Sequence, residues 1–211
     1  NLKLKKETVQ IKDLIFKISS SEKGFFDNFE NLVKVSNIKF NTLTGFPIVF
    51  TKKQLQSEEY KITIDKNLIT IHYSDYGGKF YSIISLIQLL NYYNSNLPLG
   101  LIQDSPALNW RGMHLDCARQ FYSIDEIKRL LDYMSFFKLN RFHWHLTDNE
   151  AWRVELQCYP NLTKVGAFRG YNEAIPPFYG TGYHKSGGYY SRTEIKELIE
   201  YAKLRNIEIM P

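Results

Sequence analysis

Cysteine is scarce in this sequence, and long hydrophobic runs without charge are absent. The 211 residues include only two cysteines, Cys117 and Cys158. Two cysteines are too few for a disulfide framework or a cysteine-rich metal site. We expect Cys117 to be a packed free thiol because it falls in a predicted buried strand. No apolar stretch reaches the roughly 18 residues that a membrane-spanning helix needs, so the sequence predicts no membrane span.

Low-complexity tracts, internal repeats and a signal-peptide pattern are also missing. The chain begins with Asn1 rather than Met. An exported protein that has lost its leader would begin in this way, so we expect a secreted or periplasmic location. Apolar residues make up 44% of the chain, with 15 Tyr and 14 Phe. This is enough to build a packed core in one large domain or two small ones.

The charge balance is basic, with a net charge of +5 and a pI near 9.0. A nucleic-acid-binding domain would concentrate its lysines and arginines on one face, with aromatic residues between them. Here the lysines are scattered, apart from the cluster at residues 2–6. We therefore expect a solvated basic surface and no nucleic-acid partner, and a basic nucleic-acid-binding module is the weakest functional alternative.

Residues 1–104 predict one small α+β domain. The expected elements are strands at 48–50, 60–64 and 68–73 and a helix at 80–93. The two later strands flank a turn signal and should form a hairpin, and apolar residues recur at helical spacing in the helix. We expect a mostly antiparallel sheet. The stretch 97–109 contains prolines and a glycine and is predicted to be a linker.

After this stretch the pattern changes to strands that alternate with amphipathic helices. Strands are expected at 110–116, 141–145 and 207–210. Ser123 with Glu126, and Ser191 with Glu194, form capping boxes that begin the two intervening helices. The expected buried stripes are Ile127, Leu130, Leu131, Met134 and Phe137 in the first helix and Ile195, Leu198, Ile199 and Ala202 in the second. This alternation predicts a parallel sheet.

The segment 141–152 reads Arg-Phe-His-Trp-His-Leu-Thr-Asp-Asn-Glu-Ala-Trp and is the most informative in the chain. Its histidines occupy a predicted buried strand, where each polar group needs a hydrogen-bond partner. Asp148 follows where the strand should end, and barrel and open α/β enzymes gather functional groups at the carboxyl ends of strands. Asp148 could orient a histidine in an acid–base relay, or it could cap a following helix.

The two histidines of this strand, His143 and His145, point in the same direction because the period of a strand is two. Together with Asp148 they suggest a metal site. The sequence shows no ligand on an adjacent strand, however, and histidines bonded to the backbone are commoner in protein cores. We therefore expect no metal and no cofactor.

A second group of candidates follows the strand at 110–116. Arg119 offers a rigid fork of donors that suits a carboxylate or sugar hydroxyls. The alternative is a purely structural ion pair with Asp116. Among the tryptophans, Trp144 is expected to pack in the core. Trp152 and Tyr183 lie in predicted loops, where each could stack on a sugar ring or pack on the surface.

These motifs resemble the family 20 glycoside hydrolases, which are β-N-acetylhexosaminidases. In the second half the resemblance is carried by residues 110–116, 118–121, 138–140, 143–148, 152–155, 159–163, 187–191 and 207–211. In the first half it is carried by residues 80–90 and 104–106, which are similar to the small α+β domain that precedes the barrel in that family. It covers nearly the whole chain from about residue 45, and the first 40 residues match weakly.

The resemblance implies an α+β N-terminal domain over residues 1–104, followed by the first three βα units of a (β/α)8 TIM barrel over residues 105–211. It implies that Arg119 grips the hydroxyls of the terminal sugar, with Asp116 and His145 as further substrate-binding residues. It also implies that Asp148 is a catalytic residue that supports a histidine near the catalytic acid.

The family's reaction is a retaining, substrate-assisted hydrolysis that removes terminal N-acetylglucosamine or N-acetylgalactosamine from glycans. The sugar's acetamido oxygen attacks the anomeric carbon, while an Asp orients the acetamide and the adjacent Glu protonates the leaving oxygen. This Asp-Glu pair is expected beyond Pro211, so the chain alone should be inactive.

The sequence departs from the family pattern at residues 149–151, where Asn-Glu-Ala stands in place of the usual Asp-Gln-Gly, and at Gln120, where many members have His. The alternative function is therefore a non-catalytic glycan-binding or assembly module with the same fold. The sequence after Pro211 is the discriminator, because an Asp-Glu pair at the end of a fourth strand favours the enzyme.

Overall fold

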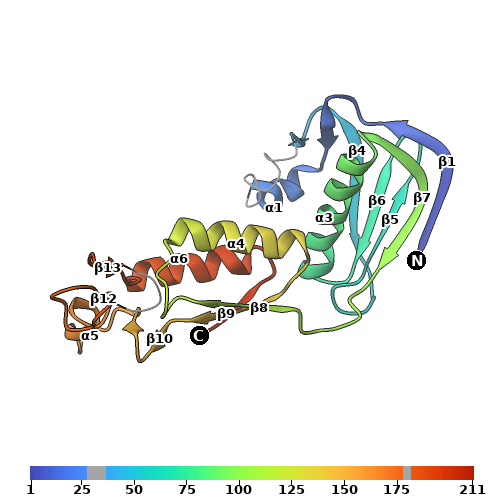
Figure 1. Cartoon of the computed structure of the whole chain (residues 1–211). Helices are drawn as coiled ribbons and strands as arrows, with labels where there is room; N and C mark the ends of the chain where they lie inside the picture. The colour runs from blue at the N-terminus through green and yellow to red at the C-terminus, as the bar shows by residue number, and fades with distance from the viewer. Residues whose placement is uncertain (28–36, 178–181) are drawn as a thin grey trace. The chain divides into compact units, whose positions relative to one another are not determined.

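The structure, a computed structural model, describes residues 1–27, 37–177 and 182–211. These residues divide into two units, Asn1–Asn109 and Trp110–Pro211 (Figure 1). Each unit has its own sheet and its own buried side chains. Within the described ranges, no helix has the length and hydropathy needed to cross a membrane.

The first unit is built on a seven-stranded sheet with the order β1-β7-β5-β6-β4-β2-β3. Its strands are β1 (Leu2–Gln10), β2 (Ile15–Lys17), β3 (Lys39–Asn41), β4 (Phe46–Lys52), β5 (Tyr60–Ile64), β6 (Ile69–Tyr73) and β7 (Asn96–Asp104). The short helices near the start are η1 (Lys12–Leu14), η2 (Ser20–Glu22) and α1 (Lys23–Asp27). The predicted hairpin is confirmed, since β5 and β6 pair antiparallel from Tyr60↔Tyr73 to Ile64↔Ile69.

This sheet is mixed, so the expectation of a mostly antiparallel sheet is wrong. The pairs β1–β7, β7–β5 and β5–β6 are antiparallel, whereas β6–β4, β4–β2 and β2–β3 are parallel. The chain reverses before β5 and again before β6, so β4 runs in the same direction as β6. Local turn signals predict the hairpin of β5 and β6, but they do not show that β4 pairs with β6.

Residues 97–104 belong to β7, so the predicted linker is wrong over this range. β7 lies between β1 and β5, and a proline is unusual inside a sheet because it has no N–H to donate. Pro98 is accommodated because β5 pairs with β7 only from Gly100 to Asp104, which leaves β1 as the only strand beside Pro98. The sequence did not predict β1, which pairs with β7 between Asn96 and Ile102.

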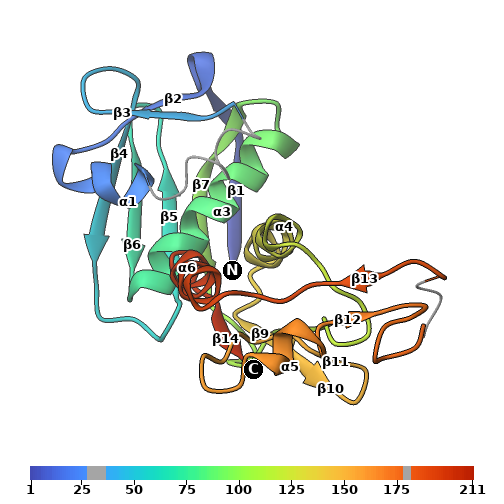
Figure 2. The ribbon, with the colours of Figure 1, turned by 90° about the vertical axis from the view of Figure 1, so that its left-hand side faces the viewer.

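Helix α3 (Tyr76–Tyr92) lies against one face of this sheet (Figure 2). It begins before the predicted start at residue 80, because Asp75 accepts a hydrogen bond from the backbone N–H of Gly78 at 2.8 Å and caps the helix. A β-carbon at Gly78 would lie 2.5 Å from the carbonyl oxygen of Glu59, so only glycine allows this close approach. The predicted apolar positions are buried, namely Phe80, Ile83, Ile84, Ile87 and Leu90.

The second unit contains the predicted parallel sheet, with the strand order β14-β9-β8. Its main elements follow one another as β8 (Gly112–Asp116), α4 (Ile124–Phe136), β9 (Arg141–His145), α6 (Arg192–Lys203) and β14 (Glu208–Met210). Both predicted capping boxes are present, at Ser123 with Glu126 and at Ser191 with Glu194. The described residues supply three parallel strands and two connecting helices, and they form no closed barrel.

Short elements fill the stretch between β9 and α6. They are β10 (Thr147–Asp148), β11 (Ala151–Trp152), α5 (Asn161–Lys164), β12 (Phe168–Arg169) and β13 (Ser186–Gly187). β10 pairs with β11 and β12 pairs with β13, both antiparallel. This stretch therefore folds back on itself twice beside the carboxyl end of β9.

Helices α4 and α6 lie side by side along one face of the three-stranded sheet (Figure 1). Phe142 and Trp144 of β9 are buried with the apolar side chains of both helices. Because side chains alternate along a strand, His143 and His145 occupy the opposite face. This alternation separates the packed core from the face that carries the polar candidates.

The predicted helix stripes are correct except at two positions, Phe137 and Ile199, which are exposed. Phe137 is the C-cap of α4 rather than part of its buried stripe. Ile199 follows the buried Leu198, and each helical residue is turned by about 100° from the one before it. The stripe of α6 is therefore narrower than the sequence suggested.

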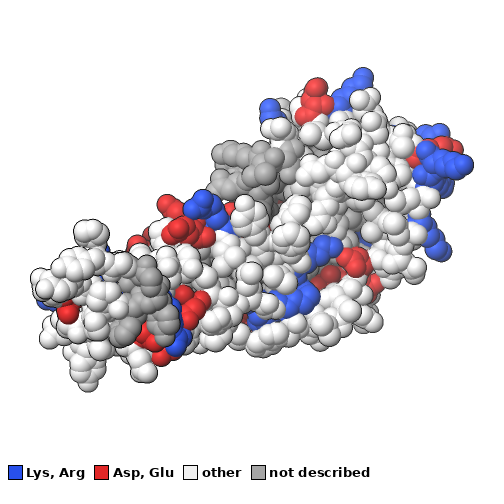
Figure 3. All heavy atoms as spheres, in the orientation of Figure 1, with Lys and Arg blue, Asp and Glu red and all other residues white. Residues whose placement is uncertain are grey.

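On the face shown in Figure 3, lysine and arginine side chains are interspersed with aspartate and glutamate. A nucleic-acid-binding domain gathers its basic side chains on one face. This face shows no such gathering of one sign among the described residues.

We expect Leu198→Ala in α6 to lower the free energy of unfolding by about 2–5 kcal/mol, because it leaves a cavity in the core between the helices and the sheet. The matched control is Ile199→Ala at the next position, where the side chain is 44% exposed and the expected loss is below about 1 kcal/mol. Urea denaturation of both variants measures the difference. Equal losses would contradict the described packing of α6.

Candidate functional site

The pairing of β8 with β9 brings the predicted site residues together. The two strands run parallel with Asp116 opposite His145, so both strands end at the same edge of the sheet. Arg119 lies in the loop after β8, and Asp148 lies in β10 directly after β9. Ion pairs and hydrogen bonds connect all four residues.

Arg119 is at the centre of this cluster. Its Nη1 atom lies 2.9 Å from Asp116 Oδ2 and 2.9 Å from Asp148 Oδ2, and its Nε atom lies 3.2 Å from Glu150 Oε2. The side chain remains 37% exposed, so a ligand can reach it. The structural ion pair with Asp116 is therefore present, and it forms one part of a larger accessible cluster.

Asp116 holds the loop that carries Arg119 through both carboxylate oxygens. Oδ1 accepts hydrogen bonds from the backbone N–H groups of Ala118 and Arg119 at 3.1 and 3.0 Å, and Oδ2 accepts one from the guanidinium at 2.9 Å. Burial by itself raises the pKa of Asp116, but the hydrogen bonds from Arg119 outweigh it and the pKa is lowered. The same ion pair raises the pKa of Arg119, chiefly through the hydrogen bond to Asp116. Both groups are therefore charged at neutral pH.

Asp148 connects the end of β9 to the guanidinium. His145 Nε2 donates to its Oδ2 at 3.0 Å, because an ionised carboxylate can only accept. The backbone N–H of Asn149 donates to Oδ1 at 2.7 Å. Both hydrogen bonds lower the pKa of Asp148, and the one from Asn149 has the larger effect. β10 turns back into β11 and not into a helix, so the helix-capping interpretation of Asp148 is wrong.

Glu150 is a member of this cluster that sequence reasoning did not select. In the sequence it stands out only as a departure from the family pattern. The β10–β11 hairpin directs its carboxylate toward Arg119. The available signal was the density of polar residues immediately after a buried strand.

A buried arginine, Arg153, anchors the loops around the cluster and was also missed. It donates to the carbonyl oxygens of Cys117 and Ala118, directly after β8, and to those of Ala167 and Gly188. The pKa of Arg153 is lowered to about 10, mainly by burial and secondly by the positive charge of Arg169. Arg153 therefore stays protonated at neutral pH. A charged residue in a predicted loop carries no sequence signal for such a buried role.

A second buried arginine, Arg169, reaches the cluster more directly. Its Nη2 atom donates to the backbone carbonyl of Arg119. The loop that presents Arg119 is therefore held by Asp116 from one side and by Arg169 from the other.

The aromatic candidates have separate roles. Trp144 is buried in the core as predicted, and its Nε1 donates to the sulfur of Cys117 at 3.2 Å. Trp152 donates to the carbonyl of Val154 at 2.6 Å. Tyr183 stacks on Tyr171, with ring centroids 4.5 Å apart. Cys117 is a buried free thiol, as predicted, and Cys158 is an exposed one.

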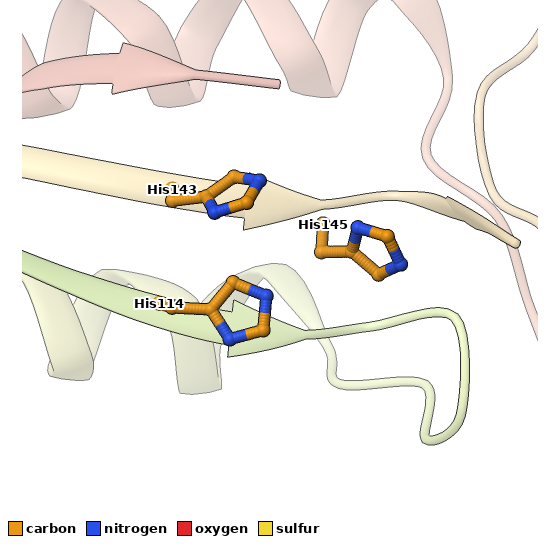
Figure 4. Close-up of side chains that lie close together, drawn as sticks. All are labelled: His114, His143 and His145. Carbon is orange, nitrogen blue, oxygen red and sulfur yellow. The ribbon is translucent and has the colours of Figure 1, made fainter.

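Three histidines lie together on the polar face of the sheet, beside the cluster (Figure 4). His143 and His145 come from β9, and His114, which was not selected from the sequence, comes from β8. Their possible metal-ligating atoms all lie within 4.8 Å of one another. Among the described residues, this is the group that could hold a metal ion.

Comparison with known proteins gives a consistent match over both units. Residues 12–105 match the model for glycosyl hydrolase family 20, domain 2, and residues 108–211 match the model for the catalytic domain of the same family. The β-hexosaminidase of Vibrio furnissii is 39% identical over 166 residues, which are 78% of this chain and 27% of that protein. The N,N'-diacetylchitobiase of Vibrio harveyi is 37% identical over 178 residues, which are 81% of this chain and 20% of that protein.

A solved structure shows the same similarity in three dimensions. The family 20 exo-β-N-acetylglucosaminidase from Vibrio harveyi, in complex with N-acetylglucosamine, has a TM-score of 0.86 and 32% identity, and the match covers 99% of this chain and 34% of that one. The chain thus spans about a quarter of the length of the curated relatives it matches. It belongs to glycosyl hydrolase family 20, with domain 2 of the family in its first half and the start of the catalytic domain in its second.

Proposed function

We propose that the complete protein containing this chain is a retaining exo-β-N-acetylhexosaminidase that removes terminal N-acetylglucosamine or N-acetylgalactosamine. The observation that carries this proposal is the accessible Arg119 at the carboxyl ends of β8 and β9, in contact with Asp116, Asp148 and Glu150. Family membership and the names of the relatives support the reaction class.

The chemistry of the cluster fits a sugar better than a charged ligand. One guanidinium faces three carboxylates, so the cluster combines a planar fork of donors with an excess of acceptors. A sugar hydroxyl both donates and accepts, and it can bridge the two kinds of group. Arg119 is proposed to grip the hydroxyls of the terminal sugar, with Asp116 and His145 completing the polar surface.

Asp148 is proposed to act through another residue and not by contact with the reacting atoms. By resemblance to the family it orients a histidine that supports the catalytic acid, and both of those groups would lie beyond Pro211. In the described residues its histidine partner is His145. Such a role requires a charged acceptor, because the acceptor fixes which ring nitrogen of the histidine carries the proton.

The three strands of the second unit are proposed to be the first three of an eight-stranded barrel. In such barrels the residues after the strands form the active site at the carboxyl-terminal face. The attack by the acetamido oxygen and the proton transfer by the neighbouring Asp-Glu pair are proposed to use later strands. The present chain would supply the sugar-gripping side of the site.

Arg119→Lys in the complete protein keeps the positive charge but loses the bidentate fork. Hydrogen bonds to charged groups contribute about 1.5–3 kcal/mol, so we expect kcat/KM on an aryl β-N-acetylglucosaminide to fall about tenfold or more. The control is Arg129→Lys on the exposed side of α4, which should leave kcat/KM unchanged. Wild-type kcat/KM in folded Arg119→Lys would reduce Arg119 to a structural partner of Asp116. Sugar binding without turnover by the wild-type protein would favour the glycan-binding alternative.

Asp148→Asn removes the charge and keeps the shape. It should lower kcat more than it raises KM, because the loss falls on the transition state. The lowered pKa of Asp148 keeps its carboxylate ionised until the pH falls through that lowered value, and the Asn variant lacks this titration, so the acidic limb of the pH–rate profile should change. The control is Asp65→Asn in the exposed turn after β5. An unaltered kcat and pH profile in Asp148→Asn would remove Asp148 from the mechanism.

A further inference from the structure

The polar face of the second sheet carries three imidazole rings from two neighbouring strands. His114 of β8 lies directly opposite His143 of β9 in the strand register, and His145 is two residues further along β9. The ring centroids are 4.6 Å apart for His114 and His143, 5.7 Å for His114 and His145, and 6.0 Å for His143 and His145. The three rings therefore surround one small volume next to the strand ends (Figure 4).

We propose that His114, His143 and His145 bind one divalent transition-metal ion of the class that imidazole ligands favour, such as Zn²⁺. Three protein ligands with one position left open are the ligand set of accessible zinc sites, with Zn–N distances of about 2.0–2.1 Å. The possible ligand atoms already lie within 4.8 Å of one another. Two nitrogens bound to one tetrahedral ion lie closer together than this, so the side chains would rotate toward one another to bind it.

The rings of His114 and His143 are not buried, so a ligand can reach them. Among the described residues, no hydrogen bond is formed by the ring of His114 or by the ring of His143, whereas Nε2 of His145 lies 3.0 Å from Asp148 Oδ2 and 3.5 Å from Arg119 Nη1. The nitrogens of the first two rings are thus available to an ion.

Asp148 supplies the outer partner that a metal-binding histidine normally has. Its Oδ2 accepts from His145 Nε2 at 3.0 Å, which leaves Nδ1 of His145 as the atom for the metal. A carboxylate that accepts from the second nitrogen of a ligating histidine fixes the tautomer and makes the ring a stronger ligand. This arrangement is present in the chain without any ion.

The local charge also favours a dication. Arg119 is the cation of the adjacent cluster, and it faces the carboxylates of Asp116, Asp148 and Glu150, which leaves two negative charges in excess. Arg141, the cation on the same face of β9, is paired with Glu208 at 3.2 Å. A divalent ion beside these carboxylates would therefore be attracted by unlike charge.

The sequence predicted no metal because it shows only the His-x-His pair of β9. The third ligand lies on β8, which is far away in the sequence and becomes a neighbour only through the parallel pairing. The proposal goes beyond the glycosidase function, and its readout is metal binding and not hydrolysis. Failure of either proposal can therefore be recognised separately.

The test uses isothermal titration calorimetry on the complete protein. The protein is first freed of metal with a chelator and dialysed, and it is then titrated with ZnCl₂. We expect one Zn²⁺ site that is lost, or weakened at least about tenfold, in His114→Gln and in His143→Gln, since each variant removes one ligand but keeps a polar side chain of similar size. The matched control is His72→Gln in β6, which lies in the first unit and outside the group. Equal melting temperatures of the metal-free variants show that all of them fold.

Two further measurements sharpen the result. Asp148→Asn should weaken Zn²⁺ binding about 10–100-fold, as the loss of an outer partner typically does. Co²⁺ in place of Zn²⁺ should give the visible absorption of a four-coordinate site in the wild-type protein and lose it in His143→Gln. The proposal is overturned if folded His114→Gln and His143→Gln bind Zn²⁺ with the stoichiometry and affinity of the wild-type protein, or if the wild-type protein binds none.

Discussion

The parallel register of β8 and β9 is the constraint on which the functional part of this chain depends. It sets Asp116 opposite His145 and His114 opposite His143. A shift by one residue would turn every one of these side chains toward α4 and α6, because the side-chain period of a strand is two. The buried Phe142 and Trp144 oppose such a shift, since they would leave the core and expose their large apolar surfaces. The apolar face of β9 therefore maintains the geometry of its polar face.

The loops after the strands are held by buried arginines in addition to two short antiparallel strand pairs. Loops leave carbonyl groups without strand or helix partners, and a buried carbonyl without a partner costs about 1–3 kcal/mol. Arg153 donates to four loop carbonyls from one side chain, and Arg169 donates to that of Arg119. An arginine suits this role because its planar fork presents five donors in fixed directions. Buried side chains thus anchor the loops around the accessible cluster of Arg119.

Two side chains belong to both proposals. His145 and Asp148 form one hydrogen-bonded pair; Asp148 contacts Arg119 on one side, and His145 faces the other histidines on the other. A dication on the histidines would draw on the negative charge that the sugar-gripping cluster also uses. Binding of the metal ion and binding of the sugar would therefore influence each other through the carboxylate of Asp148. This proximity follows from the strand ends and does not require any movement of the backbone.

The sequence by itself determined the features whose physical signals are local. The capping boxes at Ser123 and Ser191 depend on side chains three residues apart, the hairpin of β5 and β6 on its turn, and the buried face of β9 on alternation. The family motifs likewise allowed Arg119, Asp116, His145 and Asp148 to be selected before the structure placed them together.

Only the tertiary structure decided the features that depend on which strands become neighbours. It made residues 97–104 an interior strand beside β1, gave the first sheet its mixed directions, and brought Glu150 to Arg119 and His114 to His143. The reason is physical: these contacts join residues that are distant in the chain, and their energy comes from packing and pairing between elements. No periodicity or turn signal within a single segment encodes such contacts.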